Sequence, residues 1–260
     1  MKPEAIFFDI DGTLFSLKTH SIPASAKLAI NQLRNKGIKV IIATGRAYSE
    51  INNLEDLVFD GYITANGACC IDSMGNIIAQ YPLSKESMGK LVRYMEERPF
   101  PCTFFTDKGN FTNYVSEQIL TVTQLVNLPV PPVKSVSEIA KHDVIQLCAF
   151  VDAELETELL IHVLTDCNAS RWHPAFADFN AKPCTKASGM DIFLTFFNLE
   201  RAYSMAFGDG GNDITMLKHA AIGVAMDNAN DEVKAAADYV TDSADDDGIA
   251  NALKYLVDEY

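Results

Sequence analysis

An apolar run that ends in two carboxylates is the feature that most constrains this chain. Residues 5–8 have the length and composition of a short buried strand, and Asp9 and Asp11 follow where that strand should end. Gly12 permits a sharp turn there, and Thr13 adds a hydroxyl. Because a carboxylate at the edge of a core loses hydration without a partner, we expect a divalent cation beside this pair. A solvated turn after an ordinary strand is the alternative that this stretch leaves open.

Strand and helix patterns alternate through the first third of the chain. Residues 38–43 have the pattern of a strand buried on both faces, and residues 61–64 that of a further strand. We also expect a helical stretch after Thr44-Gly45-Arg46. The same rhythm returns at Lys186 and continues to residue 256. This alternation predicts the α/β class, with a Rossmann-like, doubly wound parallel sheet.

The pattern changes between these two parts. Residues 84–97 are expected to form a helix, and a hairpin signal joins two strand-like runs after it. The expected elements that follow that helix are strands 102–106, 111–114 and 144–151, a helix over 152–164, and strands 170–173 and 175–180. Helices with adjacent antiparallel strands predict an α+β cap domain. We therefore expect a discontinuous core of residues 1–82 and 184–260, interrupted by a cap of residues 83–183.

Composition excludes several classes of partner. The 260 residues are 48% hydrophobic and carry a formal net charge of −14. This charge argues against nucleic acid and anionic membrane surfaces, which require clustered lysine and arginine. No apolar run approaches the ~18 residues of a membrane span, and no signal peptide is apparent, so we expect a cytoplasmic protein. The six cysteines are then expected to be buried free thiols; a disulfide framework or a zinc site is the alternative.

Four polar sites lie at the starts or ends of predicted core elements. Because parallel strands bring their carboxyl ends to one edge of a sheet, the fold can gather these sites into one pocket. The sites are Asp9 with Asp11, Thr44 with Gly45, Lys186, and Asp209 with Asp213. Each has an ordinary interpretation when taken alone: a turn, a helix cap, a surface lysine or a helix start. Their joint occurrence in this order favours a shared site.

Together these residue types are suited to phosphoryl transfer. Carboxylate oxygens suit Mg²⁺, and a carboxylate beside both metal and phosphorus, such as Asp9, can act as nucleophile. Asp11, two residues on, can protonate the leaving oxygen and later activate water. Thr44 and the Gly45 amide at a helix start can hold phosphate oxygens, and Lys186 can neutralise charge on the transferring group.

Four stretches around these polar sites resemble the four motifs of the haloacid dehalogenase-like hydrolases. The motifs in this chain are Asp9-Ile10-Asp11-Gly12-Thr13, Thr44-Gly45-Arg46, Lys186 and Gly208-Asp209-Gly210-Gly211-Asn212-Asp213. Within that family, Gly223-Val224-Ala225-Met226 and residues 233–241 resemble the Cof-type sugar phosphatases. Relatives often have glycine where this chain has Asp227, a departure that concerns the shape of a loop.

The resemblance implies a role for each motif residue. Asp9 is implied as the nucleophile and Asp11 as the general acid/base. The implied phosphate-binding residues are Thr44, Gly45, Lys186 and Asn212. The implied Mg²⁺ site consists of Asp9, the main-chain carbonyl of Asp11, Asp209 and Asp213.

The long interval between Thr44 and Lys186 places the cap between the second and third motifs, as in Cof-type members. In that family the cap closes over the sugar and excludes water. Residues 171–178 resemble a cap stretch of hexose-phosphate phosphatases, so Arg171, His173 and Asp178 are candidate substrate contacts. Solvent-exposed strand residues are the alternative for Arg171 and His173.

The sequence therefore favours a Mg²⁺-dependent phosphatase that acts on a small phosphorylated metabolite, with a hexose or other sugar phosphate as the favoured substrate. A phosphomutase is a second enzymatic alternative, because some relatives return the phosphoryl group to the sugar. A non-enzymatic sensor with a long-lived Asp9 phosphate is a third. Asp11 argues against the sensor, because a carboxylate placed to activate water shortens the lifetime of the phosphoenzyme.

Overall fold

The computed structural model describes residues 2–257. The chain divides into two compact units, Met1–Ala79 with Thr185–Tyr260 (the core unit) and Gln80–Cys184 (the cap unit). The predicted boundaries, at 82/83 and 183/184, lie within a few residues of these divisions.

An eight-stranded sheet forms the centre of the core unit, in the order β13-β12-β11-β1-β2-β3-β4-β5. Its strands are Ala5–Phe8 (β1), Lys39–Ala43 (β2), Gly61–Thr64 (β3), Cys69–Asp72 (β4), Ile77–Gln80 (β5), Ser204–Gly208 (β11), Ile222–Ala225 (β12) and Tyr239–Val240 (β13). Neighbours from β13 to β3 pair in parallel, whereas β3 and β4 are antiparallel. The parallel α/β core is confirmed. Strands β4, β5 and β13 were not predicted.

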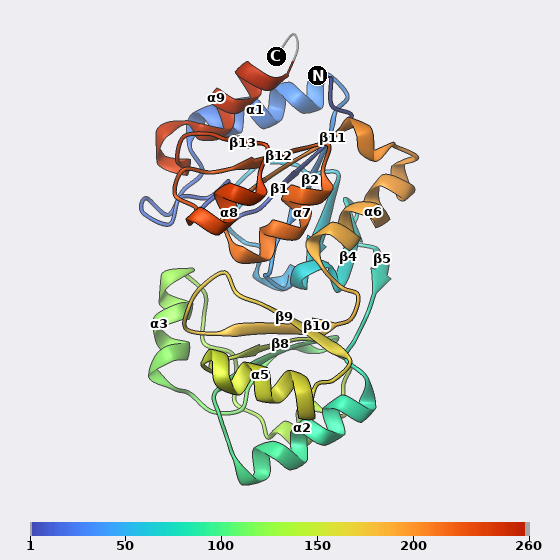
Figure 1. The fold of residues 1–260 in the computed structure, drawn as a ribbon, viewed down its shortest axis with the longest axis vertical. Helices are drawn as coiled ribbons and strands as arrows, with labels where there is room; N and C mark the ends of the chain where they lie inside the picture. The colour runs from blue at the N-terminus through green and yellow to red at the C-terminus, as the bar shows by residue number, and fades with distance from the viewer. Residues whose placement is uncertain (1, 258–260) are drawn as a thin grey trace. The chain divides into compact units, whose positions relative to one another are not determined.

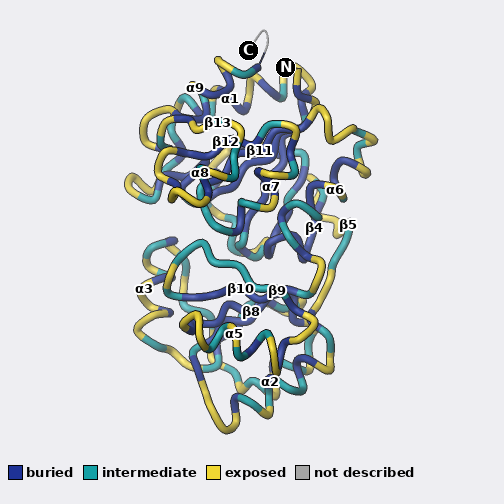
Figure 2. Tube along the Cα trace, viewed as in Figure 1, coloured by how far each residue is buried: buried dark blue, intermediate teal, exposed yellow. Residues whose placement is uncertain are grey.

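Helices cover both faces of this sheet because its central strands are apolar on both sides. They are Ala24–Asn35 (α1), Lys186–Phe197 (α6), Ile214–His219 (α7), Asp231–Ala236 (α8) and Gly248–Leu256 (α9). Ile6 and Phe8 of β1 share one apolar cluster with residues of α1 and α9, which lie side by side (Figure 1). Ala5 and Phe7 belong to a second cluster with residues of α6, α7 and α8. The period-two alternation of β1 thus explains a doubly covered sheet, whose central strands are dark in Figure 2.

The prediction of a helix after Thr44-Gly45-Arg46 is wrong. Only a short 3₁₀ turn, Tyr48–Glu50, forms there. The reason is that the loop is paired with the end of β3: the Ala65 amide donates to the Arg46 carbonyl (2.9 Å), and the Asn66 amide to the Thr44 carbonyl (3.0 Å). These bonds use the backbone groups that a helix would need for itself.

The cap unit is an α+β module whose five-stranded sheet has the order β7-β6-β8-β10-β9, with antiparallel pairing throughout. Its strands are Cys102–Thr106 (β6), Gly109–Thr112 (β7), Val144–Ala149 (β8), Cys167–Ser170 (β9) and Ala177–Ala181 (β10). Its helices are Lys85–Glu97 (α2), Glu117–Leu125 (α3), Val136–Ile139 (α4) and Ala153–His162 (α5). The strand predicted at 170–173 is β9, which lies three residues earlier. Its pairing with β10 ends at Ser170, which lies opposite Asp178. Helices α3 and α4 were not predicted.

Two further expectations concern cysteines and membranes. All six cysteines are buried and free, as predicted. No helix within residues 2–257 has the length and apolar character needed to span a bilayer.

Candidate active site

The topology brings three of the predicted sites to neighbouring strand ends. Strand β1 pairs with β2 on one side and β11 on the other, so that Phe8 lies in register with both Ile42 and Phe207. Asp9 directly follows β1, and Asp209 directly follows β11. The carboxyl edge of the core sheet therefore carries these carboxylates on adjacent strands.

Lys186 joins the carboxylates of Asp9 and Asp213. It is the first residue of α6, and its preceding Thr185 caps the helix by accepting from the Ser188 amide (3.1 Å). Its fully buried Nζ lies 2.6 Å from Asp9 Oδ1 and 2.5 Å from Asp213 Oδ1. Burial opposes the ammonium charge, but the carboxylates of Asp213 and Asp9 raise the pKa of Lys186 above its ordinary value. The lysine is therefore a fixed, charged group at the centre of the site.

Asp213 shapes the loop that carries Asp209. Its Oδ2 accepts hydrogen bonds from the backbone amides of Asp209 (2.9 Å) and Gly210 (2.8 Å), while its Oδ1 accepts from Lys186. A Cβ on Gly208 would lie 2.5 Å from the Cβ of Asp213, so this close approach requires glycine. Both oxygens of Asp213 are thus committed within the protein.

Asp209 is oriented from two sides. Thr13 Oγ1 donates to Oδ1 (2.9 Å), and Asn228 Nδ2 donates to Oδ2 (3.0 Å) as well as to the Gly12 carbonyl (2.9 Å). Gly12 has a φ of +89°, and a Cβ there would lie 2.2 Å from Asp209 Oδ2. The glycine thus permits both the turn after β1 and the approach of Asp209 to it.

Three carboxylates form a cluster that can hold a cation. Oxygens of Asp9, Asp209 and Asp213 lie within 4.8 Å of one another. Burial raises the pKa of Asp9 well above its usual range, and burial together with the Asp213 charge raises that of Asp209 to about 7. One lysine does not balance three carboxylates, so the donor set fits a hard divalent cation with oxygen ligands.

Asp11 lies outside this carboxylate cluster and binds Arg46 instead. Arg46 Nε donates to Asp11 Oδ2 (2.7 Å), and Nη2 donates to Oδ1 (2.6 Å). The Arg46 amide in turn donates to Thr44 Oγ1 (3.1 Å). The loop after β2 thus connects the threonine site with the proposed acid/base.

A chain of hydrogen bonds links the remaining predicted phosphate ligands. The Asn66 amide donates to the Thr44 carbonyl, and Asn66 Oδ1 accepts from Asn212 Nδ2 (2.9 Å). Thr44 and Asn212 are buried, and Gly45 lies between Thr44 and Arg46 in a partly buried loop. The end of β3 therefore positions two loops of the site at once.

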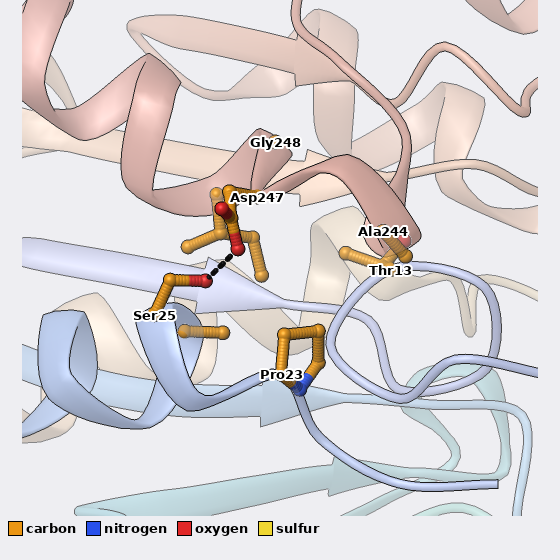
Figure 3. Close-up of a pocket in the computed structure, with 8 residues that line it drawn as sticks. Thr13, Pro23, Ser25, Ala244, Asp247 and Gly248 are labelled. Carbon is orange, nitrogen blue, oxygen red and sulfur yellow. Dashed lines mark hydrogen bonds between the residues drawn. The ribbon is translucent and has the colours of Figure 1, made fainter. Parts of the chain in front are cut away.

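The acidic run at residues 245–247 binds both the loop that follows β1 and the first turn of α1. Ser25 Oγ donates to Asp247 Oδ1 (2.5 Å), as Figure 3 shows, and Ser16 Oγ donates to Asp245 Oδ1 (2.5 Å). The run forms a 3₁₀ turn at Ala244–Asp246 directly before α9.

The three candidate cap residues have different surroundings within the cap unit. The Arg171 guanidinium contacts Glu156 (2.6 Å) and donates to the carbonyls of Pro174 and Val151. His173 Nδ1 accepts from the Ala175 amide (3.2 Å), and burial lowers its pKa. These contacts explain how the segment after β9 is held. Asp178 lies in the middle of the sheet, opposite Cys148 on β8 and Ser170 on β9.

Three residues of the site were not predicted: Arg46, Asn66 and Asn228. Arg46 lies within the motif Thr44-Gly45-Arg46, and Asn66 follows the strand predicted at residues 61–64. Their sequence positions therefore indicate that both are loop residues near the site. Their partners, Asp11 and Asn212, are remote in sequence and could not be assigned from it. For Asn228 the sequence held no comparable signal.

The chain is similar to known proteins over nearly its whole length. A family model described as haloacid dehalogenase-like hydrolase matches residues 6–253. The chain is 42% identical to a solved structure described as the HAD subclass IIB sugar phosphatase BT4131, with a TM-score of 0.92 over 97% of this chain and 98% of that one. It is 36% identical to BT1666 of Bacteroides thetaiotaomicron, described among HAD phosphatases, with a TM-score of 0.90 and 98% and 95% of the two chains covered.

A curated enzyme with a named substrate is also similar. The chain is 29% identical over 257 residues to the 5-amino-6-(5-phospho-D-ribitylamino)uracil phosphatase YcsE of Bacillus subtilis (strain 168), covering 97% of this chain and 95% of the relative. The family model spans nearly the whole chain, and the similar proteins described above are phosphatases. This protein therefore belongs to the haloacid dehalogenase-like hydrolases and is a phosphatase of that family.

Proposed function

We propose that the protein is a Mg²⁺-dependent phosphatase that hydrolyses a sugar phosphate, or a similar small phosphorylated metabolite, through a phosphoryl group carried on Asp9. The observation that carries the proposal is the buried Lys186, which joins Asp9 to Asp213 beside the Asp209 carboxylate. A charged lysine held in this place is suited to bind the oxygens of a phosphate dianion next to its nucleophile.

The first half of the reaction forms a bond between an Asp9 oxygen and phosphorus while the bond from phosphorus to the leaving oxygen breaks. Asp11 supplies the proton that the leaving oxygen takes up. Lys186, Thr44, the Gly45 amide and Asn212 would hold the phosphate oxygens during this transfer. Positioning and charge stabilisation supply most of the acceleration in such reactions.

The second half returns Asp9 to its starting form. Asp11, now ionised, takes a proton from water, whose oxygen bonds to phosphorus while the Asp9–phosphorus bond breaks. Phosphate leaves, and Asp11 is protonated again. Each residue thus ends the cycle in its initial state.

Asp9 and Asp209, with Asp213 behind them, would hold Mg²⁺. When bound, the cation would offset the charge of the carboxylates and of the phosphate, so that a carboxylate can approach phosphorus. Thr13 and Asn228 keep Asp209 oriented towards this place. The raised pKa values of Asp9 and Asp209 are consistent with carboxylates that require a cation.

One face of the cap sheet carries several polar side chains in register. Thr103, Cys148, Asp178 and Ser170 lie side by side in register across β6, β8, β10 and β9. Residues paired in this way point to the same face of a sheet. The alternate residues, Phe104, Leu147 and Phe179, belong to the apolar cluster under α2 and α5. Cys148 on this face belongs to a second apolar cluster with Ile119 and Val122 of α3, and Asp178 is buried, so the main support for the substrate class is that relatives are named for sugar and ribityl phosphates.

A screen of phosphorylated metabolites ranked by kcat/KM tests this function. We expect sugar phosphates to rank above nucleotides and phosphoamino acids, and EDTA to abolish turnover until Mg²⁺ is restored. Release of phosphate from a hexose monophosphate without a bisphosphate activator distinguishes the phosphatase from a phosphomutase. Metal-independent turnover, or no preference for sugar phosphates, would refute the corresponding part of the proposal.

A further inference from the structure

Asp11 is held by a guanidinium that no step of the proposed reaction uses. Both of its carboxylate oxygens accept from Arg46, at 2.7 and 2.6 Å, in the two-pronged geometry that only arginine provides. Both side chains are largely buried, Arg46 at 6% and Asp11 at 10% exposure. This is a built contact in the interior of the site rather than a surface ion pair.

Arg46 is itself held in place by the loop after β2. Its Nη1 donates to the Glu50 carbonyl (3.2 Å), its amide to Thr44 Oγ1, and its carbonyl accepts from the Ala65 amide. The side chain is therefore anchored at its far end and at both backbone groups. A guanidinium with these anchors fixes the carboxylate that it binds.

The contact also separates the charges of the site into two groups. Asp9, Asp209 and Asp213 share Lys186 and carry an excess of two negative charges, which one divalent cation would balance. In its ionised form, the form that takes a proton from water in the second half of the reaction, Asp11 makes with Arg46 a second group with no net charge. Without Arg46, a fourth carboxylate would be free to compete for Lys186 or for the cation.

We propose that Arg46 is the positioning residue of the general acid/base: its guanidinium fixes the Asp11 carboxylate and holds it apart from the metal-binding carboxylates. The proposal rests on the proposed role of Asp11. Arg46 acts through Asp11 and needs no contact with substrate. Its removal should therefore slow the proton transfers while binding of the cation and of phosphate is maintained.

Two properties follow that a purely structural arginine would not have. Loss of Arg46 should matter little when Asp11 is already replaced, because the residue acts through it. It should also matter most for alkyl phosphates, whose leaving oxygen needs a proton, and least for an aryl phosphate that leaves as a stable phenolate.

A double-mutant cycle tests both properties. Wild type, Arg46→Ala, Asp11→Asn and the double variant are compared in single turnovers with a hexose monophosphate and with para-nitrophenyl phosphate. With the hexose phosphate we expect Arg46→Ala to lose about 10²-fold, Asp11→Asn about 10²–10⁴-fold, and the double variant to match Asp11→Asn within about threefold. The first-turnover release of nitrophenolate should fall less than about tenfold in Arg46→Ala.

Two controls make the result interpretable. Arg34→Ala removes an arginine of the core unit whose Nε lies 3.8 Å from Asp60, and should leave both rates unchanged. Arg46→Lys keeps the charge without the two-pronged contact, and should remain at least about tenfold below wild type with the hexose phosphate. If Arg46→Ala does not fold, the same cycle is run with Arg46→Lys.

The outcomes separate this inference from the proposed function. Losses that multiply in the double variant, equal losses for both substrates, or full activity of Arg46→Lys would overturn the positioning role. Undiminished hexose phosphate turnover in Asp11→Asn would instead overturn the acid/base assignment on which the inference rests.

Discussion

Replacement of Lys186 by methionine is the perturbation whose effect can be followed furthest from the structure. Methionine keeps most of the side-chain volume but removes the cation that two buried carboxylates share at 2.6 and 2.5 Å. Breaking a buried ion pair by removing one partner costs about 3–5 kcal/mol. For a folding unit of this size, about 1 kcal/mol lowers the melting temperature by roughly 2–4 °C, so we expect a loss of about 6–20 °C in metal-free protein near pH 8.

The loss should depend on pH in a defined direction. Burial raises the pKa of Asp9 and of Asp209 in the folded state, so these groups bind more protons when folded than when unfolded. Their contribution to the free energy of unfolding therefore becomes less favourable as pH rises towards their pKa values in the folded state. For Asp209 this pKa is about 7. Without Lys186 the carboxylates lose the charge that offset this trend. The deficit of Lys186→Met should thus be smaller near pH 5.5 than near pH 8.

Thermal unfolding followed by circular dichroism at the two pH values measures this effect. Lys218→Met is the matched control, because Lys218 is exposed on α7 and its replacement should change stability by less than about 0.5 kcal/mol. Added Mg²⁺ should recover part of the loss by supplying the missing positive charge. A deficit within the range of the control, or one that is equal at both pH values, would refute the assigned role of Lys186 in balancing the carboxylates.

Three further variants or conditions test the metal site and the nucleophile. Asp9→Asn should abolish turnover while binding of a phosphate analogue persists, as measured by calorimetry; appreciable activity would exclude Asp9 as nucleophile. Gly12→Ala should sharply weaken Mg²⁺ binding, because the added Cβ would lie 2.2 Å from Asp209 Oδ2. Gly37→Ala is the control, because Gly37 also has a positive φ but has no atom within 4 Å of the added Cβ. Equal losses of Mg²⁺ affinity in the two variants would contradict this reason. Mg²⁺ affinity in titrations should rise up to about tenfold per pH unit below about pH 7, because the cation competes with the proton on Asp209; a pH-independent affinity would count against this.

The sequence was most informative where function and fold depend on strand ends. Asp9 and Asp209 follow buried apolar runs, and the rules of parallel sheets place such residues at one edge, where the structure has them. Pairing across long sequence distances is what could not be predicted. The bonds from Ala65 and Asn66 to the loop after Thr44 replaced the expected helix, and the partner of Asp11 depends on the path of that same loop. In the cap, the register of β9 against β10 moved a strand by three residues, because local composition does not specify register.

The most direct test of the account is to trap the phosphoryl group on Asp9. Asp11→Asn should still be phosphorylated by para-nitrophenyl phosphate, whose leaving group needs no proton, but should lack the base that activates water. Intact-protein mass spectrometry should then show the addition of one HPO₃ group, and borohydride reduction followed by peptide mapping should place it at residue 9. An adduct on any other residue, or turnover by this variant with no adduct at Asp9, would contradict the mechanism.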